Sequence, residues 1–428
     1  MKSQYRISVL LIFLSFVTTL NCFSQGANRK CLIVSDIHFN PMYGALTDTA
    51  LKRKLQMAPV KQWRSYFEAS AAQMTVNSGL MYQDANYGVL QSAIINMKKK
   101  LSHPAFIIIA GDFIWHNATP ADSVLKRKTI QFIASLFKEY FPAVTIIPAM
   151  GNNDTYGDDY ALQDAKFFND FAGAWSPNLP KAAAALMRAR GYYNSTMGNI
   201  ELLAINTASL SYGSQYQQQA AAMLKWLHSK LVSAGHKNIW ILMHIPPGLN
   251  GYNDSDMWNP DYTQSFVNSI VKYSPEVKFI IASHTHFNDF KVFYTAAGRP
   301  VNFMRIVPSV CSNHGNYPSF EIAEFNNITG RVTKETNWYL NLAAVGQTKI
   351  ISPLIWKDSV SLPASLNLGK TTASSLSRFL SEIKADKTGQ ALKNYVRFYN
   401  IGTPIDSAST INSHNIMNYL KADSLKSK

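Results

Sequence analysis

The sequence predicts an α/β fold built around buried sheets, and two observations carry that prediction. Short apolar runs rich in Ile, Val and Phe recur between residues 30 and 345, and polar residues follow them. These runs are CLIVSDIH, AFIIIAGD, VTIIPAMGNND, IELLAINTAS, NIWILMH, VKFIIASHTH and FMRIVPSV. Helical patterns such as DANYGVLQSAIINMKKKL and SVLKRKTIQFIASLFKEYF separate several of the runs. Alternation of apolar strands with amphipathic helices is typical of α/β proteins whose sheets are covered by helices.

The chain divides into three segments by composition. Residues 1–25 join a basic start to the apolar run SVLLIFLSFVTTL, which is typical of an export signal. We therefore expect a periplasmic or secreted protein, with an uncleaved N-terminal membrane anchor as the alternative. Residues 26–345 are expected to form the main domain, and residues 346–428 a helical C-terminal subdomain containing SLSRFLSEI and ALKNYVRFY.

The charge distribution and the cysteines indicate which partners and metal sites the chain is expected to have. The formal net charge is +15, but the lysines are scattered, which favours a solvated surface over a specific nucleic-acid site. No stretch beyond the N-terminus is long and apolar enough to span a membrane. Cys31 and Cys311 lie in apolar runs and are expected to be buried thiols. The absence of a C-x-x-C motif argues against a thiolate zinc site.

Polar residues that can bind metals follow five of the apolar runs. The segments are Asp36-Ile37-His38, Gly111-Asp112, Gly151-Asn152-Asn153-Asp154, His244 and His284-Thr285-His286. Each segment alone is explained as well by a turn, but five in succession indicate a metal site. Oxygen and imidazole ligands suit Zn²⁺, Mn²⁺ or iron. Because residues i and i+2 of a strand point the same way, Asp36 with His38, and His284 with His286, are each expected to aim at one point.

The order D-x-H, G-D, G-N, H and H-x-H resembles that of the calcineurin-like metallophosphoesterases. Within them, the sequence is most similar to the acid sphingomyelinase-like phosphodiesterases. The features of that subgroup are SDIHFN, His116 four residues after Asp112, MHIPPG, ASHTHFNDF, PSVCSNHGNYPSF and NWYLNL. The resemblance covers roughly residues 30–345. It implies a four-layer α/β/β/α sandwich of two mixed sheets, with residues 26–345 as the catalytic domain and a small helical C-terminal extension.

The resemblance also implies a site with two divalent metal ions, expected to be zinc, with manganese and iron as alternatives. Asp36, His38 and His286 would hold one ion, Asn152, His244 and His284 the other, and Asp112 would bridge both. The implied reaction is attack of a metal-bound hydroxide, in line with the leaving group, on a phosphodiester or phosphoanhydride. Sphingomyelin, another phosphocholine ester or a nucleotide would be the substrate, so the partner is a small molecule or lipid headgroup. The oligomeric state is left open.

The sequence departs from the family pattern at the residue after the metal-binding Asn. Asn153 stands where the family usually has His, and an amide can contact a phosphate oxygen but cannot deliver a proton. We therefore expect His116 to be the general acid and Asn153 to be a phosphate contact. The alternatives are a phosphomonoesterase with the same metals, and a catalytically degenerate protein that binds metal and a phosphorylated ligand.

Two smaller departures from the family pattern lie at positions 283 and 288, and several other residues are candidate substrate contacts. Ser283 replaces a common Gly, and Asn288 replaces an Asp of the subgroup. His314 is a candidate for the substrate pocket, with a turn histidine of no particular role as the alternative. The aromatic residues that could stack on a base or choline, if they are not simply core packing, are Tyr43, Trp115, Tyr156 and Trp258.

Overall fold

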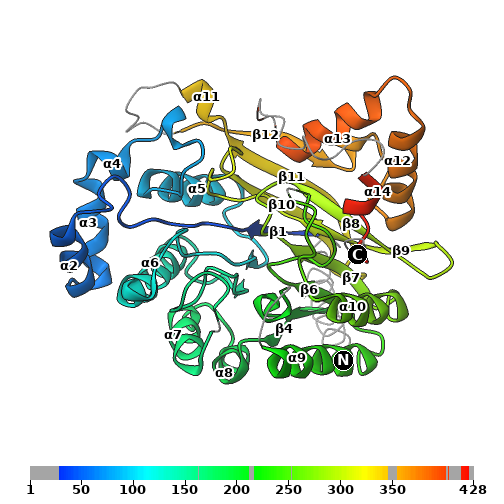
Figure 1. The fold of residues 1–428 in the computed structure, drawn as a ribbon, viewed down its shortest axis with the longest axis horizontal. Helices are drawn as coiled ribbons and strands as arrows, with labels where there is room; N and C mark the ends of the chain where they lie inside the picture. Colours follow the sequence, from blue (N-terminus) through cyan, green and yellow to red (C-terminus); the bar gives the residue numbers. More distant parts are fainter. Residues whose placement is uncertain are drawn as a thin grey trace, which may run out of the picture.

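The structure, a computed structural model, describes residues 28–161, 163–211, 216–251, 253–345, 354–401, 403 and 416–423. Within these ranges the strands form two six-stranded sheets (Figure 1). In spatial order, the first sheet contains β12 (Trp356–Leu362), β11 (Val332–Leu340), β10 (Ser319–Asn326), β1 (Asn28–Val34), β2 (Ile107–Ile109) and β3 (Ile146–Pro148). The second contains β4 (Tyr193–Met197), β5 (Ile200–Ala204), β6 (Asn238–Leu242), β7 (Val277–Ala282), β9 (Pro300–Ile306) and β8 (Asp289–Tyr294).

Both sheets are mixed, as the predicted fold requires. Strands β1, β2 and β3 run parallel, whereas β10, β11 and β12 are joined to them and to one another in antiparallel fashion. In the second sheet β5, β6, β7 and β9 run parallel, and β4 and β8 are antiparallel strands at its two edges. The carboxyl ends of neighbouring parallel strands therefore lie together at one edge of each sheet. The predicted architecture of two mixed sheets with helices is confirmed.

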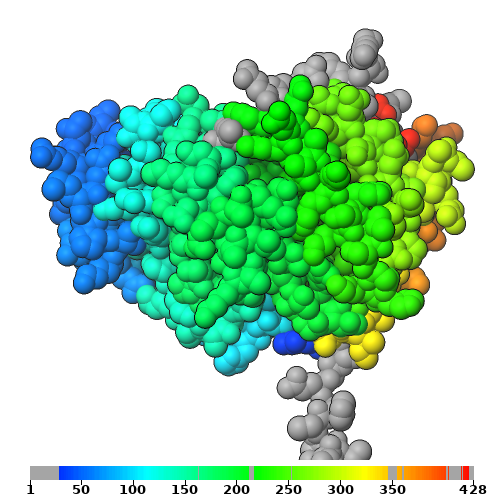
Figure 2. All heavy atoms as spheres, turned by 90° about the horizontal axis from the view of Figure 1, so that it is seen from below, coloured from blue at the N-terminus to red at the C-terminus, as the bar shows by residue number. Residues whose placement is uncertain are grey.

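Helices cover the sheets, as the amphipathic patterns predict (Figure 1). The longer helices are α2 (Thr49–Met57), α5 (Tyr87–Lys100), α6 (Ser123–Tyr140), α7 (Ala165–Trp175), α8 (Lys181–Arg190), α9 (Gln217–Val232), α10 (Pro260–Lys272), α12 (Ala373–Ala385) and α13 (Gln390–Asn400). Shorter ones are α3 (Trp63–Glu68), α4 (Ala71–Met74), α11 (Leu342–Val345) and α14 (Ile416–Tyr419). Seen from below in Figure 2, the green segment that contains α9 and α10 forms much of the surface, and the blue segment with α2 and α3 lies at one end.

The two sheets meet in an aromatic core. The ring of Trp240 on β6 makes edge-on contacts with Phe106 and Phe325 of the first sheet, at centroid distances of 5.6 and 5.3 Å. Its indole nitrogen donates a hydrogen bond of 2.7 Å to the carbonyl of Gly330, so its polar atom is satisfied although the residue is fully buried. Cys31 and Cys311 are buried free thiols, and that prediction is confirmed.

The C-terminal segment contains a strand besides the expected helices. Strand β12 pairs with β11 and extends the first sheet, while α12 packs on β8 and β9 of the second. A single strand of polar and apolar residues gives too weak a periodicity to be recognised between two helical patterns. No described helix has the length and apolar character needed to cross a membrane. The predicted signal at residues 1–25 lies outside the described residues.

Candidate metal centre

The candidate ligands lie just beyond the carboxyl ends of the parallel strands, where ligand sites of α/β sheets are found. Asp36 follows β1, Asp112 follows β2 and Asn152 follows β3, all in the first sheet. His244 follows β6, and the pair His284 and His286 follows β7, in the second sheet. The edges of both sheets therefore contribute to one site.

The predicted strand geometry of the D-x-H and H-x-H pairs is wrong. Strand β1 ends at Val34 and β7 at Ala282, so both pairs lie in loops. Asp36, His38, His284 and His286 have left-handed backbones, with φ of 46°, 39°, 76° and 67°. Such a conformation costs about 1–3 kcal/mol per non-glycine residue and concentrates at functional sites. The ligands converge because tight loops turn them inward, not because strand residues alternate.

One group of ligand atoms gathers around Asp36, His38 and Asp112. Their candidate ligand atoms all lie within 4.8 Å of one another. The Nε2 atom of His38 is 3.9 Å from Oδ1 of Asp36 and 3.4 Å from Oδ2 of Asp112. Nε2 of His286 lies 3.5 Å from Oδ1 of Asp36. Two carboxylates and two imidazoles thus face the same point.

A second group shares Asp112 with the first. Nε2 of His244 lies 3.1 Å from Oδ2 of Asp112, 3.0 Å from Oδ1 of Asn152 and 3.3 Å from Nδ1 of His284. The amide nitrogen of Asn152 donates a 2.7 Å hydrogen bond to Asp159, which turns the amide oxygen of Asn152 toward His244. The seven residues predicted as ligands are therefore brought together, with Asp112 between the two groups.

Surrounding groups fix the orientation of the imidazoles. Nδ1 of His38 lies 2.8 Å from the carbonyl of Ile114, and Nδ1 of His244 lies 2.8 Å from the carbonyl of Ala110. A carbonyl only accepts, so each Nδ1 carries the hydrogen and Nε2 faces the centre. Ser283, where the family commonly has Gly, donates to the same Ala110 carbonyl through its hydroxyl. The departure at this position is therefore accommodated without loss of a ligand.

Asp154, the last residue of the GNND segment, holds the loops in place. Its carboxylate accepts hydrogen bonds from the backbone N–H groups of Gly151, Asp112, Phe113 and Ile114, at 2.9, 2.9, 2.9 and 3.3 Å. The Asn152 loop and the Asp112 loop are thereby tied together. Asp154 thus has a supporting role, while Asn152 supplies a candidate ligand.

Two glycines permit this close approach of the loops. A Cβ on Gly151 would lie 2.0 Å from Oδ1 of Asp112, and Gly111 has φ of 95° with His244 2.8 Å from its Cβ position. Any larger residue at either position would push a ligand side chain away. The G-D and G-N pairs therefore serve the geometry of the site.

The electrostatics of the site favour bound positive charge. Burial lowers the pKa of His38 and of His244, but the neighbouring carboxylates, above all Asp112, raise both to about 9. Burial and the neighbouring imidazoles lower the pKa of His284 to about 3, so that side chain stays neutral. A neutral imidazole is the form that binds a metal ion. His284 therefore offers a nitrogen lone pair, whereas the carboxylates hold protons on His38 and His244 that a bound cation would replace.

The residues present fit a divalent metal ion. Oδ1 of Asp36 and Nε2 of His38 are buried without a hydrogen-bond partner among the described residues. Buried polar atoms are rarely left unpaired, because desolvation costs about 1–3 kcal/mol for each group. Both atoms point into the cluster, where a cation that takes oxygen and imidazole ligands would satisfy them.

His116 lies beside the cluster and is oriented by a residue that sequence analysis missed. Its ring stacks on His38 at a centroid distance of 3.9 Å, and its Nδ1 lies 2.5 Å from Oδ1 of Asp84. The other oxygen of Asp84 accepts a 3.0 Å bond from the backbone N–H of His116. Asp84 precedes His116 by 32 residues and belongs to no local motif, so no sequence signal could identify it.

Asn153 and His314 line the cavity that opens onto the cluster, with Asp112, His284 and His286. Asn153 donates to both oxygens of Asp112, at 2.9 Å from its backbone N–H and at 3.0 Å from its side-chain amide. The ring of His314 packs edge-on against that of His286 at 4.3 Å. Burial and neighbouring histidines lower the pKa of His314 to about 4. Both residues are thus placed in the wall of the cavity over the cluster.

Comparison with known proteins agrees with this geometry. The model of the family described as calcineurin-like phosphoesterase matches residues 29–288. This match covers more than half of the chain, which therefore belongs to the calcineurin-like phosphoesterase family. The recognition of the family from its motifs is confirmed, and the chain is a phosphoric-ester hydrolase of the metallophosphoesterase kind.

Curated relatives of similar sequence have names that are more specific than that of the family. Sphingomyelinase phosphodiesterase C from Dictyostelium discoideum is 26% identical over 317 residues, covering 71% of this chain and 68% of the relative. Acid sphingomyelinase-like phosphodiesterase 3b from Mus musculus is 23% identical over 382 residues, 82% of this chain and 79% of the relative. Cyclic GMP-AMP phosphodiesterase from Homo sapiens is 24% identical over 336 residues, 74% of this chain and 73% of the relative. These relatives carry the sphingomyelinase-like and phosphodiesterase names that the motifs predicted.

Proposed function

We propose that this chain is an exported phosphodiesterase with a two-metal centre and with His116 as its general acid. One observation carries the proposal: seven ligand-type side chains from five strand ends converge, and two of their buried atoms, Oδ1 of Asp36 and Nε2 of His38, lack a partner among the described residues. A site that served only stability would satisfy these atoms within the chain.

The chain's residues divide between two ions as the family motifs imply. Asp36, His38 and His286 would hold one ion, Asn152, His244 and His284 the other, and Asp112 both. When bound, the ions supply the positive charge that activates water and neutralises the phosphate. Histidine, carboxylate and amide ligands favour zinc, with manganese and iron as alternatives.

His116 is placed to donate the proton that the leaving group needs. Because Nδ1 lies on Asp84, the free Nε2 of His116 is available to a substrate oxygen in the adjoining cavity. The Asp84 carboxylate fixes the orientation of the ring through the Nδ1 contact and the bond from the backbone N–H of His116. Asp84 is thus a positioning residue for His116.

Asn153 supports substrate binding in place of the usual family histidine. Its amide lies 3.0 Å from Oδ2 of Asp112 and also lines the cavity, so it can turn an N–H toward a phosphate oxygen. It offers no titratable proton near pH 7. This leaves His116 as the acid, and it also motivates a second candidate function, a protein that binds metal and a phosphorylated ligand without turnover.

The proposed substrates are phosphodiesters. The relatives are named for sphingomyelin and for cyclic GMP-AMP, both of which contain a phosphodiester bond. A phosphocholine lipid or a nucleotide is therefore the substrate class we propose, with a phosphomonoester as the alternative for the same metals. Export rests on the basic and apolar pattern of residues 1–25.

A rate comparison on the full mature chain tests the proposal. The protein, reconstituted with Zn²⁺ or Mn²⁺, is assayed with bis(p-nitrophenyl) phosphate and with p-nitrophenyl phosphate, and Asp112→Asn serves as the blank. Faster turnover of the diester that disappears in the blank is expected. Faster turnover of the monoester would make the protein a phosphomonoesterase. Two bound metals without turnover of either ester would favour the binding protein.

A further inference from the structure

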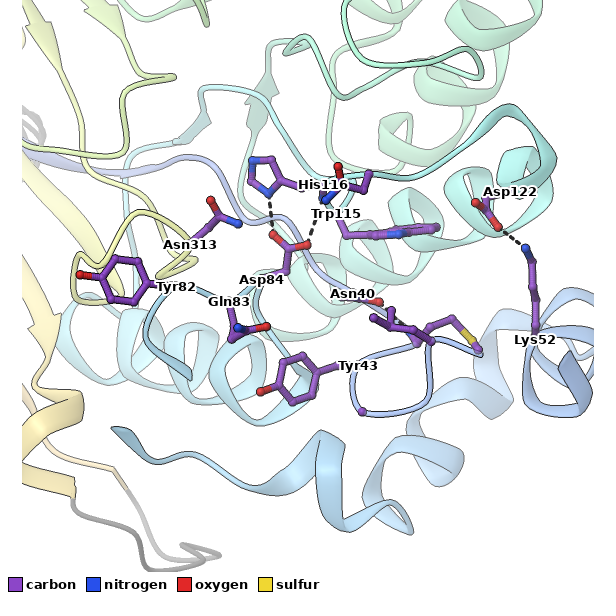
Figure 3. A pocket seen from close by; sticks show the side chains of 14 residues that line it. Asn40, Tyr43, Lys52, Tyr82, Gln83, Asp84, Trp115, His116, Asp122 and Asn313 are labelled. Atoms are coloured by element: carbon purple, nitrogen blue, oxygen red, sulfur yellow. Dashed lines mark hydrogen bonds and ion pairs between the residues drawn. The ribbon is translucent and has the colours of Figure 1, made fainter. Parts of the chain in front are cut away.

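A second cavity adjoins the metal centre on the side of His116. It has a volume of about 720 Å³, against about 220 Å³ for the cavity over the cluster, and His116 lines both. Figure 3 shows His116 and Asp84 in its wall, with Tyr82 and Asn313 on one side of them and Trp115 on the other. We call it the side cavity. The small cavity has room for a phosphoryl group, and the side cavity for a much larger substituent.

The position of His116 decides which part of a substrate lies in the side cavity. A general acid must lie within hydrogen-bond reach of the oxygen that departs. The departing substituent therefore continues from His116 into the adjacent space, and the side cavity is the larger space there. This step rests on the proposed function, in which His116 is the acid.

The charges in the wall disfavour an anionic leaving group. Among the described residues that line the side cavity, Lys52 is the only lysine or arginine, and its Nζ is paired with Oδ1 of Asp122 at 2.5 Å. Asp84 adds a carboxylate beside His116. A departing pyrophosphate would meet this carboxylate with no unpaired lysine or arginine to offset its charge. The wall therefore favours the uncharged leaving group of a diester over the charged leaving group of a phosphoanhydride.

The polar side chains in the wall also argue against a lipid leaving group. The side-chain amides of Gln83 and Asn313 make no hydrogen bond to the described residues, and both residues retain exposure. Acyl chains packed against them would leave these amides desolvated and unpaired, which costs about 1–3 kcal/mol for each group. A group with hydrogen-bonding edges would satisfy them instead.

Tyr82 offers an exposed aromatic ring to the side cavity. The residue is 55% exposed, yet its backbone has φ of 64°, which is rare for a bulky side chain. A 2.8 Å bond from its N–H to the carbonyl of Ser312 holds this conformation, and its ring lies close against Gly315. Strain at an exposed aromatic residue is typical of a ligand-binding position. The buried Trp115 contributes a second aromatic side chain to the same cavity.

We propose that the side cavity binds the leaving group of the reaction, and that this group is an uncharged, ring-bearing alcohol such as a nucleoside. Aromatic rings can stack on a base, and the amides can bond to its edges. The reaction breaks the bond between phosphorus and the nucleoside oxygen, which keeps the electron pair and takes a proton from His116. Water supplies the hydroxyl group that bonds to phosphorus, and its other proton restores His116. The products are a phosphomonoester and a free nucleoside.

Variants of the side cavity test the proposal on the metal-loaded full chain. The substrates are thymidylyl-(3′→5′)-thymidine, which releases a nucleoside, and ATP, whose hydrolysis is followed by the release of pyrophosphate, the leaving group when the α-phosphorus is attacked. Tyr82→Ala is expected to lower kcat/KM for the dinucleotide about tenfold, and Gln83→Ala severalfold. Neither variant is expected to change the rate with ATP by more than about twofold. Gln264→Ala, an exposed glutamine on α10, is the matched control.

Two readouts separate this proposal from the proposed function. Turnover of bis(p-nitrophenyl) phosphate by the unmodified protein reports the proposed function alone. Binding of thymidine in the presence of inorganic phosphate, followed by calorimetry, reports the side cavity even without turnover. Weaker thymidine binding by Tyr82→Ala than by Gln264→Ala supports the proposal. Equal binding by the two variants, or an equal loss of rate with ATP and the dinucleotide, overturns it.

Discussion

The protein contains two buried clusters of charged residues that differ in how their charges are balanced. In the metal centre, Asp36 and Asp112 lie among imidazoles, the hydroxyl of Ser35 and the amide of Asn153. In the second cluster, between β9, β10 and β11, Arg305 lies between Glu321 and Glu335 at 2.9 and 3.1 Å. All five charged residues are buried.

The difference teaches how a ligand site can be told from a structural one. Every guanidinium nitrogen of Arg305 has a partner, including Oδ1 of Asn288 at 2.7 Å and the carbonyl of Asp289. One oxygen of Glu321 lacks a partner among the residues that the structure describes, but Arg305 supplies the cation that the cluster needs. Within the described part of the chain, no lysine or arginine contacts the two carboxylates of the metal centre. A buried carboxylate pair without such a cation indicates that a bound ion completes the site.

The sharpest test of this contrast exchanges one buried carboxylate for an amide in each cluster. Asp36→Asn is expected to lower metal content and to reduce phosphodiester turnover about 10³-fold or more, because several kcal/mol of charge stabilisation are removed. Glu335→Gln is expected to keep both the metal content and the rate of phosphodiester turnover. Metal content is measured by mass spectrometry on dialysed protein, together with the rate on bis(p-nitrophenyl) phosphate. Equal metal content in the two variants would contradict the distinction between the clusters.

The second test removes the cation of the structural cluster. Arg305→Met leaves two carboxylates buried without a counterion, and the free energy of unfolding is expected to fall by about 3–5 kcal/mol. Urea denaturation measures the loss. Replacing Glu321 and Glu335 by Leu in the same protein should recover most of it, since no buried charge remains. A loss below about 1 kcal/mol in the single variant would mean that the cluster contributes little to stability.

His116 has features of both clusters, because Asp84 partners one ring nitrogen while the other faces a cavity. His116→Ala is expected to slow hydrolysis of a diester with a poor, alkoxide-type leaving group about 100-fold or more. The rate with a nitrophenolate leaving group should change far less, since that group departs without a proton. Asp84→Asn should show the same pattern with a smaller loss. Equal losses on both substrates would show that the pair serves structure instead of proton transfer.

Much of the metal centre was predictable because its chemistry follows a linear pattern. Asp36, Asp112, His244 and the other ligand types each close an apolar run, and the parallel strands bring those ends together. The left-handed backbones were not predictable, because Asp36 and His38 have no glycine that would mark such a turn. The same holds for Asp84, whose role exists only through a contact across 32 residues.

The fold likewise has features that the sequence predicts and features that it does not. The two sheets follow from strong apolar runs, whereas β12 was missed because its seven residues give a weak pattern. Asn288, a departure from the subgroup, bonds to Arg305 and to the carbonyl of Phe398 on α13. It thereby joins the H-x-H loop to the C-terminal helices, a link that depends on long-range packing. Such links are set by tertiary structure and leave no local signal.

The smallest expected effect is the pH dependence of stability that the structural cluster creates. Burial and the charge of Glu321 raise the pKa of Glu335 from an ordinary value of 4.5 to about 8, against the opposing effect of Arg305. Between these values the folded chain holds a proton that the unfolded chain has lost. This contribution to stability is therefore complete below pH 4.5 and is lost as pH rises through 8.

Glu335→Gln should flatten this decline, because an amide does not titrate. The urea midpoints of both proteins are compared at pH 5.5 and pH 8 with a chelator present, so that metal binding adds no pH dependence of its own. The midpoint of the unmodified protein should fall more steeply over this range, which corresponds to a loss in the free energy of unfolding of up to about 1.4 kcal/mol for each unit of pKa difference. Identical slopes would mean that Glu335 is already ionised in the folded state. Arg305 would then face two ionised carboxylates, and the structural cluster would carry a net negative charge without any bound ion.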